Sequence, residues 1–132
     1  GDRATVLDVS DFSLCAIAAA RAGADHVASV EAAHDRGSDG GTALLAATVA
    51  QLGNACDDPD AFRILRARPD AVVAADLSGP ANVANVVVGE PYYEVLEGHH
   101  LQEALNFLYT VRGLRRRGVA ASGARCVPAR AT

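Results

Sequence analysis

Residues 4–23 read ATVLDVSDFSLCAIAAARAG, and this stretch predicts a strand, a turn and a helix in direct succession. The strand covers residues 4–9, which are mainly apolar. The helix is rich in alanine, which favours close packing on a sheet, and Gly23 is its expected stop signal. A strand that leads directly into a helix is typical of α/β proteins with parallel sheets.

Four further stretches are expected to be strands. They are residues 26–31, 62–67 and 85–89, followed by a last strand that reaches Cys126 and Val127. The stretch at 85–89, NVVVG, is apolar on both faces, as is typical of a central parallel strand. Further helices are expected at 43–52 and 101–114, with a short helix and a loop in 70–84. This alternation predicts an α/β fold in which helices cover both faces of a mostly parallel sheet.

The helix expected at 101–114 carries apolar residues at helical spacing. They are Leu101, Ala104, Leu105, Leu108, Val111 and Leu114. This stripe is expected to pack on the sheet. Alanine at Leu105 or Leu108 would then lower the free energy of unfolding by about 2 to 5 kcal/mol. Residues 115–117 are all arginine, and a cationic run at this place interacts favourably with the C-terminus of the helix.

Composition and length predict one domain. The chain has 132 residues, of which 32–41 are expected to form a flexible glycine-rich loop. All 12 basic residues are arginine, and the absence of methionine favours a fragment of a longer chain. The net charge of −4 argues against general nucleic-acid binding, because such binding depends on the neutralisation of phosphates.

The sequence predicts neither a membrane span nor a signal peptide, because no stretch of about 18 apolar residues is free of charges or breakers. We therefore expect a cytoplasmic or nuclear location and no membrane partner. The three cysteines lack CxxC spacing, which indicates reduced thiols rather than a metal site. His99 and His100 are adjacent, so in a helix they point in directions too different to bind one metal ion.

Acidic residues occur where the expected strands end. Asp8 and Asp11 flank the end of the first strand, and Glu31 ends the second. Ligands of α/β proteins bind at the carboxyl ends of the strands, where a carboxylate can accept hydrogen bonds from both hydroxyls of a nucleotide ribose. A solvated surface carboxylate is an equally good interpretation of Glu31. The first turn contains no glycine, and Asp11 would repel a pyrophosphate, so a dinucleotide-dependent dehydrogenase is disfavoured.

Four strings follow one another in the order and spacing of a known family. They are VLDVSDFS at 6–13, AAARAGADHVASVE at 18–31, NVVVGEPYYEVLEG at 85–98 and GARCVPARAT at 123–132. Together they resemble the S-adenosylmethionine-dependent protein arginine methyltransferases, in particular the members with two tandem modules. This resemblance implies a Rossmann-like methyltransferase domain over residues 1–132. Residues 123–132 are similar to the start of the connection to the family's β-barrel, so we expect the chain to be truncated before that barrel.

The resemblance implies a binding region for S-adenosylmethionine at the ends of the first two strands. Asp8, Ser10 and Asp11 lie in the segment that is similar to the family's glycine-rich first motif. Glu31 matches the acidic residue that binds the ribose of the cofactor. Ser10 stands near one of the glycine positions of that motif, which has no glycine in this sequence.

The resemblance also implies a pair of catalytic glutamates. Glu90 matches the first glutamate of the family's substrate loop, and the second falls on Glu97, with Glu94 as the other candidate. Two carboxylates can hold a planar guanidinium by charge-assisted, bidentate hydrogen bonds. An arginine-containing protein is therefore the expected substrate.

Two functions are compatible with this pattern. In the first, the chain is a module that transfers methyl from S-adenosylmethionine to arginine in the parent protein. In the second, it is a catalytically inactive pseudo-methyltransferase module that pairs with an active sister module or a homodimer partner. The glycine-free turn and the short spacing of the glutamates favour the second function for this segment. Phe12 and Leu14 would then occupy space that the cofactor needs, so we expect weak cofactor binding or none.

Overall fold

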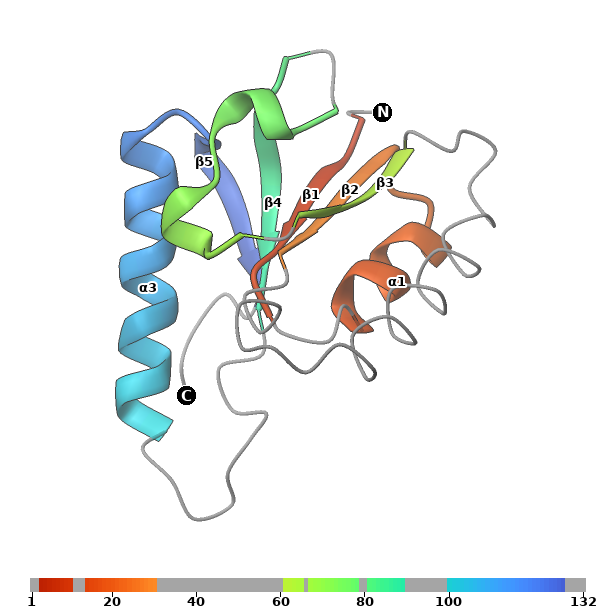
Figure 1. Ribbon diagram of the computed structural model, residues 1–132. Coiled ribbons are helices and arrows are strands. Elements are labelled where there is room, and N and C mark those ends of the chain that lie inside the picture. The colour runs from red at the N-terminus through yellow and green to blue at the C-terminus, as the bar shows by residue number, and fades with distance from the viewer. Residues whose placement is uncertain are drawn as a thin grey trace.

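A parallel sheet with the strand order β3-β2-β1-β4-β5 forms the centre of the molecule (Figure 1). The computed structural model describes residues 3–10, 14–30, 61–65, 67–78, 81–89 and 100–127. Within these residues the strands are β1 (Thr5–Asp8), β2 (His26–Val30), β3 (Phe62–Leu65), β4 (Ala84–Val88) and β5 (Ala120–Val127). All five strand predictions are confirmed, and the sheet is parallel throughout the described residues, as the alternation of strands and helices predicts.

Helix α1 (Leu14–Arg21) covers one face of the sheet. On this face Val6 and Val27 are buried in a cluster that includes Ala16 of α1. The helix ends as predicted, because Gly23 has a φ of +96° and the N–H of Ala24 donates to the carbonyl of Ala19. Glycine reaches this left-handed conformation without the steric penalty that a Cβ atom brings.

Helix α3 (His100–Arg116) covers the opposite face, together with 3-10 turns η3 (Pro69–Ala71) and η4 (Ala74–Asp76) (Figure 1). Leu7 of β1 and Val87 of β4 are fully buried on this side. The alternation of Val86, Val87 and Val88 between the two core clusters confirms that β4 is apolar on both faces. The core is thus divided by the sheet into two layers.

The predicted rotation of α3 about its axis is wrong in part. Val111 and Leu114 are buried as expected, but Leu105 and Leu108 are 43% and 56% exposed. Phe107, which lay outside the predicted stripe, is buried instead. Burying the aromatic ring removes more apolar surface from water than burying a leucine at the same place, so the helix turns Phe107 towards the sheet.

Helix α3 also extends beyond its predicted end. It continues to Arg116, and the stop is Gly118, which has a φ of +71°. The N–H of Val119 then donates to the carbonyl of Leu114, at 2.9 Å. Arg115 and Arg116 lie in the last turn, as the favourable interaction of cations with a helix C-terminus predicts.

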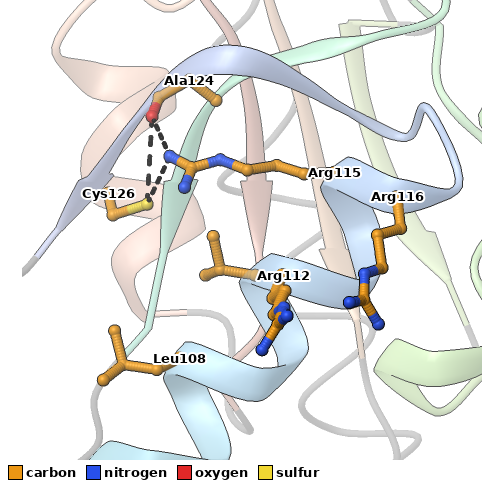
Figure 2. A pocket seen from close by; sticks show the side chains of 7 residues that line it. Leu108, Arg112, Arg115, Arg116, Ala124 and Cys126 are labelled. Carbon is orange, nitrogen blue, oxygen red and sulfur yellow. Dashed lines mark hydrogen bonds between the residues drawn. The ribbon is translucent and has the colours of Figure 1, made fainter.

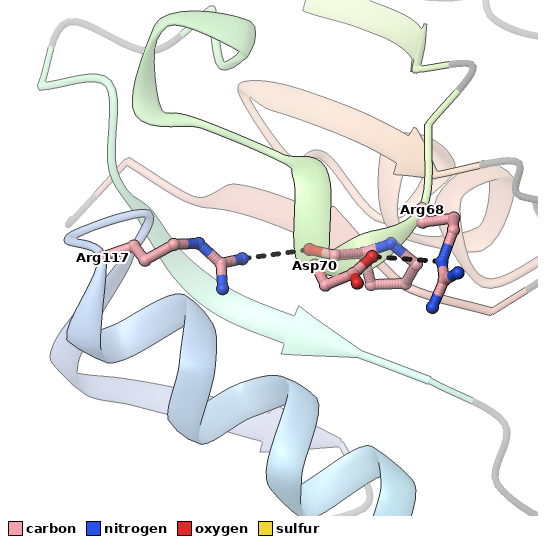
Figure 3. A network of polar contacts seen from close by, with 4 residues as sticks. Arg68, Asp70 and Arg117 are labelled. Atoms are coloured by element: carbon pink, nitrogen blue, oxygen red, sulfur yellow. Dashed lines mark hydrogen bonds and ion pairs between the residues drawn. The ribbon is translucent and has the colours of Figure 1, made fainter.

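Arg117 ties the end of α3 to the turn η3. Its guanidinium donates to the carbonyl of Pro69 at 3.1 Å (Figure 3). The neighbouring ion pair between Arg68 and Asp70 has a separation of 3.2 Å, but both side chains are largely exposed. Exposed pairs of this kind contribute little to stability because water screens them.

Several predicted segments lie outside the described residues. They are the helix at 43–52, the loop at 32–41 and the end of the chain at 128–132. Residues 123–127 of the predicted connection to a β-barrel form the second half of β5. No helix in the described ranges is long and apolar enough to cross a membrane.

Candidate functional site at the carboxyl edge of the sheet

The strand order reverses between β1 and β4, and this reversal marks the candidate site. β2 and β3 lie on one side of β1, whereas β4 and β5 lie on the other. Asp8 pairs with Val88, so both central strands end at the same edge. In open α/β sheets the loops diverge at such a point and leave a crevice in which ligands bind.

The predicted site residues fall into a described and an undescribed group. Asp8 and Ser10 lie at the carboxyl end of β1. Glu31 and Glu90 directly follow Val30 of β2 and Gly89 after β4 in the sequence. The undescribed group consists of Asp11, Glu31, Glu90, Glu94 and Glu97. The structure thus brings the strand ends that precede Glu31 and Glu90 to the same edge as Asp8, and it describes the contacts of Asp8 and Ser10.

Asp8 is a fully buried carboxylate that holds the first turn together. Its Oδ1 accepts the backbone N–H of Ser10 at 2.8 Å and also the Ser10 hydroxyl. Its Oδ2 accepts the backbone N–H of Ala16 at 2.7 Å. A buried carboxylate requires such donors, because an ionised group without them would be very costly to desolvate.

The contact to Ala16 also has an electrostatic component. Ala16 is in the first turn of α1, where backbone N–H groups have no partner within the helix. A negative charge near this end interacts favourably with the helix dipole. Asp8 therefore connects β1, the turn after it and α1. Asp8 and Ser10 are the described members of the predicted cofactor-binding set, and both form hydrogen bonds within the chain itself.

Ser29 is a second buried polar residue at this edge, and it is not among the site residues predicted from the sequence. It is fully buried, and β1 and β2 pair so that it stands opposite Asp8. Because directly paired residues of parallel strands face the same side of the sheet, Asp8 and Ser29 both face α1. A serine in the otherwise apolar stretch VASV could have indicated this position.

Gly89, directly after β4, is in close contact with Phe107 of α3. A Cβ atom on Gly89 would lie 2.6 and 2.8 Å from two ring carbons of Phe107, and 3.3 Å from a methyl group of Val9. These distances leave no room for any side chain. Glycine is therefore required for this packing, and it places the ring of Phe107 over the start of the segment that leads to Glu90.

Replacing Gly89 with alanine is expected to lower the free energy of unfolding by about 1 to 3 kcal/mol, because the buried ring of Phe107 must move. Urea denaturation monitored by circular dichroism measures this change. Gly123→Ala is the matched control, since a Cβ atom at Gly123 would meet no atom within 4 Å. Equal effects of the two substitutions would contradict the close approach of Phe107.

The described residues contain no cluster of three or more His, Cys, Asp or Glu side chains that could hold a metal ion. Cys15 and Cys126 are free thiols. Cys56 lies outside the described residues.

No protein-family model matches the sequence, and comparison with curated proteins found no match. Among solved structures, the chain is similar to the Trypanosoma brucei PRMT1 enzyme-prozyme heterotetrameric complex with AdoHcy. The sequence identity is 18%, the TM-score is 0.58, and the match covers 95% of this chain and 32% of that chain. The chain thus spans about a third of that protein. This likeness and the parallel sheet of the described residues establish that the chain has a Rossmann-like methyltransferase fold.

Proposed function

We propose that this chain is the Rossmann-like module of a protein arginine methyltransferase, and that the full-length protein transfers methyl from S-adenosylmethionine to arginine. The observation that carries the proposal is the pairing of Asp8 with Val88, because it ends β1 and β4 at the same edge of the sheet, where ligands of open α/β sheets bind. The likeness of the fold to an arginine methyltransferase structure supports it. The sequence resembles most the second, degenerate module of protein arginine N-methyltransferase 7.

Glu90 and Glu97 are the proposed catalytic residues, with Glu94 as the alternative to Glu97. S-adenosylmethionine supplies the methyl group to be transferred. The role of the carboxylates is to hold the substrate guanidinium by bidentate hydrogen bonds and to offset its positive charge. Holding the nucleophilic nitrogen in one orientation lowers the entropic part of the barrier.

The substitution Glu90→Gln in the full-length protein tests this role. If this module carries the reaction, the substitution removes the charge and keeps the shape, so we expect kcat on an arginine peptide to fall by about 100-fold or more. Asp70→Asn, at an exposed surface carboxylate, is the control and should retain activity. Unchanged turnover of Glu90→Gln, with an unchanged circular dichroism spectrum, would assign the reaction to a different module.

A second candidate function is a pseudo-methyltransferase module that packs against an active sister module or a homodimer partner. The engagement of Asp8 with Ser10 and Ala16 favours it, because these groups are already satisfied within the chain. The first turn also lacks the glycines that allow a backbone to approach a nucleotide closely. In this case the module contributes to the assembly of the enzyme rather than to methyl transfer.

Calorimetric titration of the chain with S-adenosylmethionine distinguishes the two functions, because it measures the dissociation constant of the cofactor. We expect weak binding or none, because the described part of the predicted cofactor set is occupied by internal hydrogen bonds. A micromolar dissociation constant would contradict the pseudo-module. Glu31→Gln should then weaken binding, since Glu31 is the proposed ribose-binding residue.

A further inference from the structure

The exposed side of α3 and the adjoining strand β5 form a groove that the proposed function does not use. It is lined mainly by Leu108, Arg112, Arg115 and Arg116 of α3 and by Ala124 and Cys126 of β5 (Figure 2). Its volume is about 530 Å³. We call these six residues the α3–β5 groove. β5 is the last strand in the order of the sheet, so the groove lies at the edge of the described fold.

The charge of this region is opposite to that of the whole chain. Residues 104–127 contain five of the 12 arginines and none of the 16 acidic residues, whereas the chain has a net charge of −4. Arg112, Arg115 and Arg116 line the groove itself. Such segregation creates a local positive potential that attracts a negatively charged partner.

The arginines of the groove have different roles. Arg115 is engaged with the protein, because its guanidinium donates to the carbonyl of Ala124 at 2.8 Å and contacts the Sγ of Cys126 at 3.6 Å. Figure 2 shows Arg115 reaching across to β5, while Arg112 and Arg116 extend from the helix without such a contact. Neither Arg112 nor Arg116 forms an ion pair with any residue that the structure describes. Arg115 therefore fixes the wall of the groove, and the other two remain available to a partner.

Two exposed leucines lie on the same side of α3 as Arg112 and Arg116, and the four residues form an exposed stripe along the helix. Leu105, Leu108, Arg112 and Arg116 follow at i, i+3, i+7 and i+11, so they lie along one side of the helix. Leu105 and Leu108 are 43% and 56% exposed. Single exposed leucines are common, but here they extend a cationic groove whose floor reaches the buried Val111. One half of the stripe is apolar and the other half is cationic.

We propose that the α3–β5 groove docks an acidic, amphipathic helical segment of a partner protein. The apolar side chains of that segment cover Leu105 and Leu108, and its carboxylates pair with Arg112 and Arg116. An apolar face at helical spacing beside charged positions is the complement of this stripe. The inference is independent of the proposed function, because it uses neither the carboxyl edge nor the cofactor.

A protein segment suits this surface better than a nucleic acid. A nucleic acid would need many phosphate contacts along an extended basic face. In this groove the available cations are the side chains of Arg112 and Arg116, which lie on adjacent turns of one helix. Leu105 and Leu108 would add nothing to phosphate binding. A helix with both carboxylates and apolar side chains uses the whole stripe.

The test uses the complete chain and a fluorescein-labelled helical peptide of about five turns, with leucine at one face and glutamate elsewhere. Fluorescence anisotropy measures its binding. We expect the double variant Arg112→Glu and Arg116→Glu to bind at least about tenfold more weakly, because both ion pairs become repulsive. Replacing the peptide's glutamates with lysine should restore binding to that double variant. Arg63→Glu, at an exposed position of β3, is the matched control and should bind like the unmodified chain.

Two further measurements locate the bound peptide. A peptide of the same composition with scrambled leucines should bind at least about tenfold more weakly, because it has no apolar face. In a Cys15→Ala and Cys56→Ala background, the bound peptide should slow modification of the Cys126 thiol. Equal binding of the scrambled peptide would overturn the proposal, as would tighter binding of duplex DNA or of anionic vesicles. Self-association of the chain that Arg112→Glu with Arg116→Glu abolishes would also overturn it, in favour of a second copy as the occupant.

Discussion

Replacing Leu114 with alanine is expected to lower the free energy of unfolding by about 2 to 5 kcal/mol. Leu114 is fully buried between α3 and the sheet, in the core cluster that also contains Leu7 and Val87. Truncation removes the apolar surface that is buried on folding and leaves a cavity that the closely packed neighbours fill only in part. Urea denaturation, analysed with a common slope for the variant and the unmodified chain, measures the loss.

Leu105→Ala is the matched control, because it deletes the same atoms from the same helix. Leu105 is 43% exposed, so the expected change is within about 0.5 kcal/mol. This pair of variants tests the rotation of α3 that the structure shows. A larger loss for Leu105→Ala than for Leu114→Ala would restore the rotation expected from the sequence.

Replacing Asp8 with alanine is expected to lower the free energy of unfolding by about 3 to 5 kcal/mol, because hydrogen bonds to a charged acceptor are stronger than neutral ones. The substitution leaves the N–H groups of Ser10 and Ala16 and the Ser10 hydroxyl without their acceptor. It also removes the negative charge beside the first turn of α1. Thermal and urea denaturation of the variant measure the effect.

Asp25→Ala is the control for Asp8. Its Oδ2 accepts one backbone N–H, that of Ala4, at an exposed position. Water can replace this acceptor, so we expect a loss below about 1 kcal/mol. Similar losses for the two variants would contradict a central role of Asp8 in connecting β1 to α1.

The strands and the end of α1 could be predicted from the sequence, since they depend on neighbours along the chain. The apolar run at 85–89 indicated a central strand because burial on both faces of a sheet requires it. Gly23 indicated the end of α1 because glycine adopts a positive φ at low cost. Asp8, Asp11 and Glu31 were candidate site residues because ligands bind where strands end, whereas Glu90 was implied by the resemblance to the methyltransferase family.

The contacts of these residues depend on segments that are distant in sequence, and local patterns do not contain that information. The order of the strands is what brings the ends of β1 and β4 together. Phe107 packs closely on Gly89 and faces the sheet, whereas the apolar stripe in the sequence had predicted Leu105 and Leu108 on that side. The partners of Asp8 are likewise set by how α1 packs on the sheet, since its backbone donor at Ala16 comes within 2.7 Å only in the folded chain. Periodicity identifies which elements form, whereas the side chains that meet are determined by how well those elements pack against one another.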